Sequence, residues 1–350
     1  MRVRVSPSAQ DMTPRSVHDL ATPVIVIDLD ALDRNIATMG LLRPGAKLRP
    51  HVKATKCTVL ARRQVAAGHK NFTCATVREM IGMADAGLGD DLLLANEVID
   101  AGILKSLAEA QNHAMITVAI DSDETLRAAA RAGIENVLID VNVGLPRCGC
   151  APSVAGALAD RARQAGLNVR GVMGYEGHLM MVATRDERQA KVAESMALLT
   201  RAAQDVGGDI VSAGGTGTYD LHESTGVTEL QAGSYSLMDT QYAQLGLPFE
   251  QAAWVLATVV SRSEKWSVIN AGLKSMSTDH GNPQVAGHSV WFCSDEHTTI
   301  AATHGDQLAV GTAVRVAPSH IDPTIAMHHT AWVVRGEEVV DSWEIDLRGW

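Results

Sequence analysis

Long apolar stretches are missing from this 350-residue sequence, and their absence excludes several classes of protein. No apolar run approaches the roughly 18 residues of a membrane-spanning helix, so we expect no membrane partner. The first ten residues carry Arg2 and Arg4 but no apolar segment, which argues against a secretory signal. We therefore interpret residues 1–20 as a disordered leader.

Basic residues are also scarce, with 30 Lys and Arg against 40 Asp and Glu and a formal net charge of −10. Phosphate backbones are bound by clustered Lys and Arg, so this acidity argues against a nucleic-acid partner. The five cysteines are an odd number, and Cys148 and Cys150 lack the two-residue spacing of a redox pair or zinc knuckle. We expect reduced thiols and a cytoplasmic protein.

What the sequence does have is a regular alternation of short β-type runs with helical runs. Several helical runs end at glycine, the residue that best accepts the left-handed conformation after a helix. Strand alternating with helix implies a parallel sheet, and eight such strands predict a (β/α)8 barrel, with an open doubly wound sheet as the alternative. The predicted strands are Lys47–Lys53, Asn71–Ala75, Asp91–Ala95, Met115–Ile120, Val137–Asn142, Val169–Gly174, Ile210–Ala213 and Glu229–Ser236.

After residue 250 the helical periodicity stops, and all six tryptophans fall in this part of the chain. Six short strands joined by Gly, Asn, Pro and Asp turns are predicted there, including Gln307–Val316. We therefore expect a barrel over residues 29–249 and a β-rich domain over residues 250–350. The opening strand, within residues 21–28, is expected to join the β-rich domain.

Reactive residues stand where a barrel places its chemistry, at the carboxyl ends of the strands. Lys53 ends the first predicted strand, and His51 lies two residues back on the same face. A lysine in a barrel mouth must be paired or used, since an unpaired buried charge is costly. Such a lysine readily lowers its pKa, which suits it to Schiff-base formation. A surface lysine is the alternative interpretation.

Two glycine-rich loops follow the last two predicted strands, and they indicate a phosphate site. The first loop contains Ser212, Gly214, Gly215 and Thr216, and the second contains Gly233, Ser234 and Tyr235. An ordinary flexible turn is the alternative for either loop alone. A lysine of this kind beside a phosphate site suggests pyridoxal 5'-phosphate, with Thr76 at another strand end as a further cofactor-binding candidate.

Several segments, in this order, resemble the fold-type III pyridoxal-phosphate enzymes, whose parent is alanine racemase. Within that group the sequence is similar to the branch of D-threonine aldolase and D-serine dehydratase. The resemblance implies a barrel that carries the cofactor, a β-domain that completes the active site, and a homodimer with the site near the interface. The segments are Thr22–Ile36, Arg49–Cys57, Gly144–Gly149, Gly174–His178, Ser212–Thr216 and Pro318–Asp322.

The resemblance also implies a role for individual residues. Lys53 matches the cofactor lysine, Arg147 the contact to the pyridine side of the ring, and Tyr175 a residue that packs near the cofactor. The two glycine-rich loops match the phosphate loops. His178 matches a base-like histidine close to the substrate. A surface ion pair for Arg147 and a core aromatic for Tyr175 are the alternatives.

His320 and Asp322 match the segment in which this branch binds its divalent metal. In a β conformation, side chains two residues apart point to the same face, so those of His320 and Asp322 could hold one ion. In the dehydratases of the branch this segment resembles His-x-Cys, and a site made of a thiolate and an imidazole selects zinc. The carboxylate of Asp322 favours Mn²⁺ or Mg²⁺ over Zn²⁺ and favours an aldolase.

The reaction that these parts imply is retro-aldol cleavage of a small-molecule D-β-hydroxy-α-amino acid to glycine and an aldehyde. The amino acid would displace Lys53 from the cofactor, the metal would bind the β-hydroxyl, and His178 or a water on the metal would take its proton. The main alternative is a D-serine or D-threo-3-hydroxyaspartate dehydratase, which releases ammonia and a keto acid. A non-catalytic pyridoxal-phosphate carrier fits less well because carriers lack the β-domain, and a racemase would leave the metal segment without a role.

Overall fold

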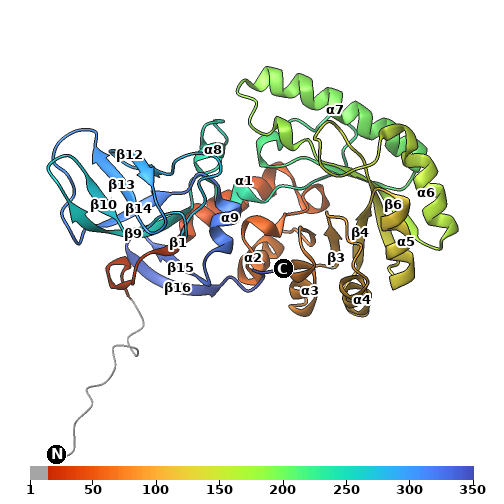
Figure 1. The fold of residues 1–350 in the computed structure, drawn as a ribbon. Helices are drawn as coiled ribbons and strands as arrows, with labels where there is room; N and C mark the ends of the chain where they lie inside the picture. Colours follow the sequence, from red (N-terminus) through yellow and green to blue (C-terminus); the bar gives the residue numbers. More distant parts are fainter. Residues whose placement is uncertain (1–14) are drawn as a thin grey trace, which may run out of the picture.

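The computed structural model describes residues 15–350 and contains two parts, a parallel barrel and a β-rich domain (Figure 1). Residues 1–14 of the expected leader lie outside the described residues. Residues 15–20 differ from that expectation, because Val17–Asp19 forms a 3-10 helix and both Val17 and Leu20 are buried. Among the described residues, no helix is both long enough and apolar enough to cross a membrane.

The barrel sheet has seven parallel strands in sequential order, β2 to β8. An eighth segment closes it without forming a regular strand, since Leu48 bridges Leu230 of β8 and His51 bridges Thr73 of β2. Pro50 in this segment has no N–H to donate, which limits ladder pairing. The strands are β2 Asn71–Cys74, β3 Asp91–Leu94, β4 Ile116–Ile120, β5 Asn136–Asp140, β6 Asn168–Gly174, β7 Ile210–Ala213 and β8 Glu229–Leu230.

Helices surround this sheet and bury it with one continuous apolar core (Figure 1). The glycines expected to end helices do so: Gly68, Gly87, Gly133 and Gly166 all have positive φ. The helices before the β-rich domain are α1 Leu29–Leu42, α2 Thr58–Ala66, α3 Val77–Asp85, α4 Ala101–Ala110, α5 Asp123–Ala132, α6 Ala155–Gln164, α7 Arg185–Val206 and the short α8 Thr240–Ala243.

The β-rich part is a nine-stranded sheet in which six strands close into a ring, because β9 pairs with both β14 and β10. Strand β1, early in the sequence, extends this sheet between β9 and β15 and is parallel to β15. Its strands are β1 Val24–Asp28, β9 Ala253–Arg262, β10 Ser267–Ile269, β11 Gln284–Val285, β12 His288–Cys293, β13 Thr298–Ala302, β14 Ala313–Ala317, β15 Thr330–Arg335 and β16 Glu338–Glu344.

The predicted fold class, a barrel followed by a β-rich domain, is thus confirmed, with local corrections. The predicted strand Glu229–Ser236 is a strand only at its first two residues, and Ser234–Ser236 forms a 3-10 helix after Gly233. Of the predicted strand Gln307–Val316, only the last residues form a strand, as part of β14 (Ala313–Ala317). Helix α9 (Ile321–Ala326) replaces the expected β conformation after His320.

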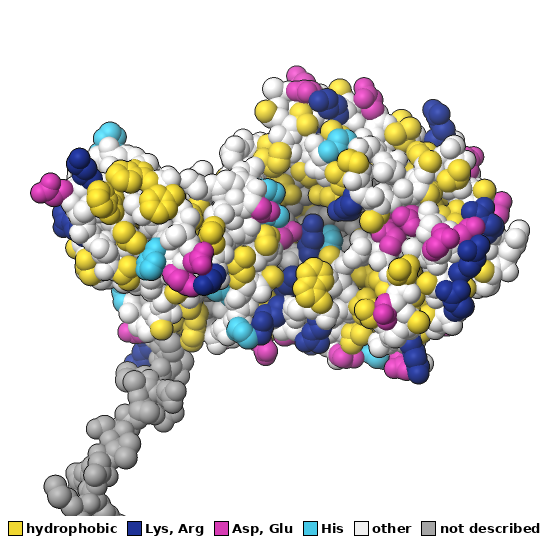
Figure 2. Space-filling model, viewed as in Figure 1, with side chains coloured by type: hydrophobic (Ala, Val, Ile, Leu, Met, Phe, Trp, Pro, Cys, Tyr) yellow, Lys and Arg dark blue, Asp and Glu magenta, His cyan; other side chains and the backbone are white. Residues whose placement is uncertain are grey.

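The two parts lie side by side, and the outline of the molecule is notched between them (Figure 2). The chain crosses from one part to the other more than once. At the C-terminus, Leu347 N–H donates to Lys56 O, and the Asp346 carboxylate accepts from the backbone and side chain of Thr58 at the start of α2. Residues close to Lys53 and the β-rich part are therefore held together by hydrogen bonds.

Candidate active site

A cavity opens at the carboxyl ends of the barrel strands and holds most of the residues that the sequence singled out. Its predicted members follow four strands, β5 to β8, and the closing segment of the barrel, which is how a barrel assembles a site. The cavity is lined by His51, Lys53, Ala75, Ala95, Asn96, Glu97, Asp140, Arg147, Cys148, Met173, Tyr175, Gly214, Gly215, Thr216, Gln231, Gly233, Ser234 and Tyr242.

Lys53 enters this cavity from a 3-10 helix, Val52–Ala54, that directly follows the closing segment of the barrel. Its Nζ lies 3.4 Å from Asp322 Oδ2 and 5.9 Å from the centre of the Tyr175 ring. Burial by itself would lower the pKa of Lys53, but Asp322 and Tyr175 raise it above the ordinary value. The amine is thus held as an ammonium ion by a carboxylate from the β-rich part.

His51 lies beside Lys53 and accepts a hydrogen bond at Nδ1 from the Lys53 backbone N–H, at 3.4 Å. Burial lowers the pKa of His51 well below its ordinary value, and the positive charges of Lys53, Lys56 and Arg147 lower it further. His51 is therefore a neutral imidazole near pH 7.

Arg147 and Tyr175 form the next wall of the cavity. The Arg147 guanidinium carbon lies 5.3 Å from the centre of the Tyr175 ring, within the range of a cation–π contact. Burial raises the pKa of the Tyr175 hydroxyl, so this side chain stays neutral. Tyr175 therefore lies close to two cations and gives the cavity an aromatic surface.

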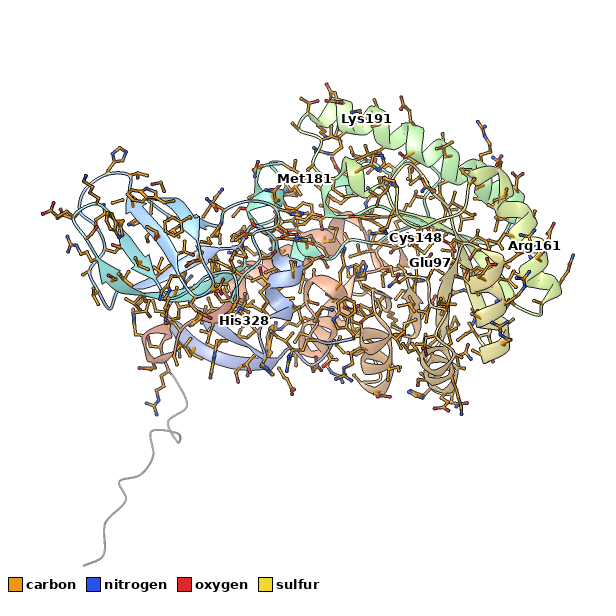
Figure 3. All side chains as sticks on the ribbon, viewed as in Figure 1. Glu97, Cys148, Arg161, Met181, Lys191 and His328 are labelled. Carbon is orange, nitrogen blue, oxygen red and sulfur yellow. The ribbon has the colours of Figure 1, made fainter. Side chains whose placement is uncertain are left out.

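Acidic residues that the sequence analysis did not select stand near Arg147. Burial, together with the charge of Glu97, raises the pKa of Asp140 well above its ordinary value. Glu97 and Cys148 lie next to one another in Figure 3, and Glu97 raises the pKa of the Cys148 thiol to about 12. The signal was available, because Asp140 is the last residue of β5 and Glu97 follows β3 closely.

The two glycine-rich loops form another part of the cavity lining, to which they contribute Gly214, Gly215, Thr216, Gly233 and Ser234. The loops are joined to each other, since the Tyr235 N–H donates to Thr216 Oγ1 at 3.0 Å. A Cβ on Gly233 would lie 2.3 Å from the carbonyl oxygen of His51, so only glycine allows this close approach. Backbone and hydroxyl groups are the polar groups of these loop residues.

Three of the predicted cofactor-binding residues lie outside the cavity lining. Thr76 caps α3 by accepting from the Glu79 N–H, and the Ser212 hydroxyl accepts from Gln231. The Tyr235 side chain is fully buried, and its hydroxyl accepts from the Gln64 amide.

His178 is exposed, and its ring packs against Gly144, where an added Cβ would lie 3.0 Å from it. The predicted base is therefore not among the residues that line the cavity.

The predicted metal pair is divided between two environments. His320 precedes α9, and Asp322 lies in the first turn of that helix, so the assumed β geometry is wrong. Asp322 contacts two residues of the cavity lining: its Oδ1 accepts from the Ser234 hydroxyl at 3.0 Å, and its Oδ2 lies 3.4 Å from Lys53 Nζ. Both residues nevertheless stand at the same helix start, next to the barrel mouth.

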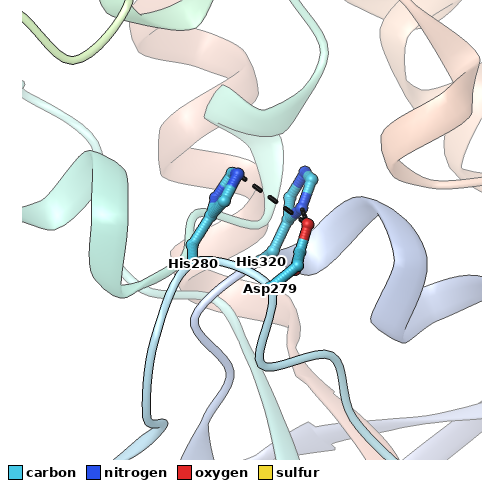
Figure 4. Close-up of side chains that lie close together, drawn as sticks. All are labelled: Asp279, His280 and His320. Carbon is cyan, nitrogen blue, oxygen red and sulfur yellow. Dashed lines mark hydrogen bonds and ion pairs between the residues drawn. The ribbon is translucent and has the colours of Figure 1, made fainter.

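His320 instead belongs to a group with Asp279 and His280 whose possible ligand atoms lie within 4.8 Å of one another (Figure 4). His320 Nδ1 lies 2.8 Å from Asp279 Oδ2, and the His280 ring stacks on the His320 ring at 4.1 Å. A bridge between Ser277 and His320 brings these segments together. No sequence pattern pointed to Asp279 or His280, because they lie about forty residues before His320.

His328 and His329, which neighbour α9 in sequence, do not join this group. His328 Nε2 donates to the Ser275 carbonyl, and His329 contacts Arg348. The imidazole and carboxylate groups of Asp279, His280 and His320 are donors that suit a divalent ion, and the carboxylate of Asp322 lies at the start of the same helix.

A parallel barrel with a lysine, two glycine-rich loops and an adjoining β-rich domain defines a class of protein, and comparisons with known proteins identify it. The family described as "Alanine racemase, N-terminal domain" matches residues 27–241, and the family described as "Putative serine dehydratase domain" matches residues 252–334. The chain belongs to the alanine racemase N-terminal domain family, in the branch that contains D-threonine aldolases and hydroxyaspartate dehydratases.

Three relatives carry this assignment. A D-threonine aldolase of Arthrobacter sp is 36% identical, over 99% of this chain and 97% of the relative. The crystal structure of D-threonine aldolase from Filomicrobium marinum superposes with a TM-score of 0.91 at 34% identity, covering 96% of this chain and 97% of that one. D-threo-3-hydroxyaspartate dehydratase from Delftia sp. HT23 superposes with a TM-score of 0.87 at 27% identity, covering 96% and 100%. The resemblance found in the sequence is thus confirmed.

Proposed function

We propose that this chain is a pyridoxal-phosphate- and divalent-metal-dependent aldolase that cleaves D-β-hydroxy-α-amino acids, such as D-threonine, to glycine and an aldehyde. The observation that carries the proposal is that Lys53 lines the same cavity as the two glycine-rich loops and lies 3.4 Å from the carboxylate of Asp322. The higher similarity to D-threonine aldolases than to the dehydratase supports it.

The cavity fits pyridoxal phosphate by its donor set. Lys53 offers the amine that would hold the cofactor, and Gly215, Thr216, Gly233 and Ser234 offer uncharged polar groups to a phosphate. The N–H groups of Gly214 and Gly215 already donate to Glu176 and Thr218, so the phosphate would be met by N–H groups further along, at Thr216 and Gly217. Arg147 and Tyr175 would contact the ring. When bound, the cofactor supplies an electron sink for the carbanion that bond cleavage leaves.

The chain's own residues would then orient the substrate and move one proton. His320 and Asp322 are the proposed ligands of a Mn²⁺ or Mg²⁺ ion, which when bound would act as a Lewis acid toward the β-hydroxyl. Asp279 would fix the His320 ring by accepting from Nδ1–H, which leaves Nε2 as the ligand atom. His178 is the proposed base for the hydroxyl proton.

The second candidate function is β-elimination, as in the dehydratase relative. The carboxylate of Asp322 favours the aldolase, because dehydratases of the branch have a cysteine at the matching position of this segment. We also propose that the protein assembles as a homodimer and that it is located in the cytoplasm.

Product analysis tests the choice directly. Purified protein supplied with pyridoxal phosphate and Mn²⁺ should convert D-threonine to acetaldehyde and glycine, with no ammonia released. Ammonia and a keto acid from D-threonine, D-serine or D-threo-3-hydroxyaspartate would contradict the aldolase and establish the dehydratase.

A further inference from the structure

Directly after Tyr175, a buried carboxylate lies behind the first glycine-rich loop. Glu176 is fully buried, and no step of the proposed reaction uses it. Tyr175 faces the cavity, whereas Glu176 faces the reverse side of the run Gly214–Thr218. The end of β6 therefore contacts both the open side and the hidden side of the proposed cofactor site.

Three donors converge on the Glu176 carboxylate. The Gly214 N–H lies 3.1 Å from Oε2, the Thr218 hydroxyl lies 2.8 Å from Oε1, and His222 Nε2 lies 3.1 Å from Oε1. His222 is itself buried, with 4% of its surface exposed. Burial alone would raise the pKa of the Glu176 carboxyl, but His222 and the hydrogen bonds lower it, so the group is ionised.

These contacts hold both ends of the loop in one conformation. Gly214 has a φ of +82°, and an added Cβ there would lie 2.2 Å from Leu230 and 2.9 Å from His222 Nε2. The Glu176 carboxylate accepts from both Gly214 and Thr218, so it fixes the first and last residues of the run. The Thr218 hydroxyl also accepts from the Gly215 N–H at 3.2 Å. The intervening Thr216 is left facing the cavity.

We propose that Glu176, with His222, is a positioning pair that sets the Gly214–Thr218 loop in the conformation that receives the cofactor's phosphate group. This inference rests on the proposed function, because it assumes that the loop binds a phosphate. Glu176 does not touch the phosphate itself, and its negative charge is offset by the donors around it. Its effect should therefore be confined to ligands that carry the phosphate.

The test compares the affinities of the cofactor-free full chain for pyridoxal phosphate and for pyridoxal, which lacks only the phosphate. Glu176→Gln keeps the side-chain shape but places an NH2 group against at least one of the three donors. We expect the preference for the phosphorylated ligand to fall by about ten-fold, the factor that one charge-assisted hydrogen bond contributes. Pyridoxal affinity should stay within about two-fold of the wild type.

Thr218→Val provides a second variant that keeps the carboxylate and should give a smaller loss of the same preference. Asp91→Asn is the matched control, because Asp91 is another buried carboxylate but binds Arg49 and Arg170 at the amino end of β3. It should lower the melting temperature without changing the ratio of the two affinities.

The outcomes separate this inference from the function on which it rests. A wild type that binds both ligands equally would show that the loops bind no phosphate, and the cofactor assignment would fail. A wild type with a clear preference, retained in Glu176→Gln and Thr218→Val, would overturn the positioning role alone. Equal weakening of both ligands would also overturn it, because it would show general damage to the cavity.

Discussion

The barrel side of the cavity and its α9 side differ in how deeply their polar groups are buried. Behind the glycine-rich loop, the side chains of Glu176 and His222 are 0% and 3% exposed. Beside α9, Asp279, His280 and His320 are 50%, 42% and 25% exposed. Buried polar groups that hydrogen-bond to one another stay in place, whereas exposed ones exchange partners with solvent.

This difference in burial indicates which half of the site is already formed before a ligand binds. The barrel loops are fixed by hydrogen bonds within the described chain, so a cofactor would meet a formed site. The side chains on the α9 side are more exposed, and Asp322 is paired with Lys53 and Ser234. We therefore expect a firmly held cofactor and an exchangeable metal ion, and the following predictions test this contrast.

The largest effect should follow loss of the lysine on the barrel side. Lys53→Ala should abolish the covalent, borohydride-reducible linkage to the cofactor together with the aldolase activity, because among the described residues no other amine lines the cavity. Mass spectrometry of the reduced protein locates the linkage. Lys56→Arg is the control, since Lys56 is paired with the buried Glu79 and should not carry the cofactor. Cofactor found on Lys56 would refute the assignment.

Metal removal should have the next largest effect, and it should leave the barrel side unchanged. A chelator should lower activity by at least about 100-fold, the upper end of what loss of a metal-site group costs, while cofactor absorbance and the melting temperature stay the same. Mn²⁺ should then restore activity. Asp322→Asn should mimic the chelator, although it also removes the negative charge beside Lys53. Full activity without metal would contradict the role of the α9 side.

The contrast also explains which parts could be predicted from the sequence. Lys53, Arg147, Tyr175 and the glycine-rich loops were found because strand ends of a parallel barrel meet at one edge, whatever lies between them in sequence. The same rule could have found Asp140 and Glu97. The barrel itself followed from the alternation of strands and helices with glycines at helix ends.

The α9 side was harder to predict because tertiary contacts shape it. The side chains of His320 and Asp322 separate because a helix begins between them, which the short segment did not reveal. Asp279 and His280 reach His320 through a bridge between distant segments. Thr76, by contrast, is predicted to bind the cofactor because it follows a strand. Its spacing to Glu79, however, is the sequence pattern of a helix cap, and the two residues form such a cap on α3.

The smallest effects should distinguish two arrangements of the ion on the α9 side. If the ion lies between His320 and Asp322, Asp279 only orients the His320 ring, and His280 only stacks on it. Asp279→Asn should then weaken Mn²⁺ binding by about ten-fold, as loss of an orienting carboxylate does, and His280→Asn by no more than about two-fold. We expect this order because Asp322 lies beside Lys53, where an ion must be to act on a β-hydroxyl. Electron paramagnetic resonance of free Mn²⁺ measures the affinities directly, with His329→Asn as the control outside the group. If His280→Asn weakens binding as much as Asp279→Asn while Asp322→Asn leaves it unchanged, the ion is held by Asp279, His280 and His320, away from the lysine.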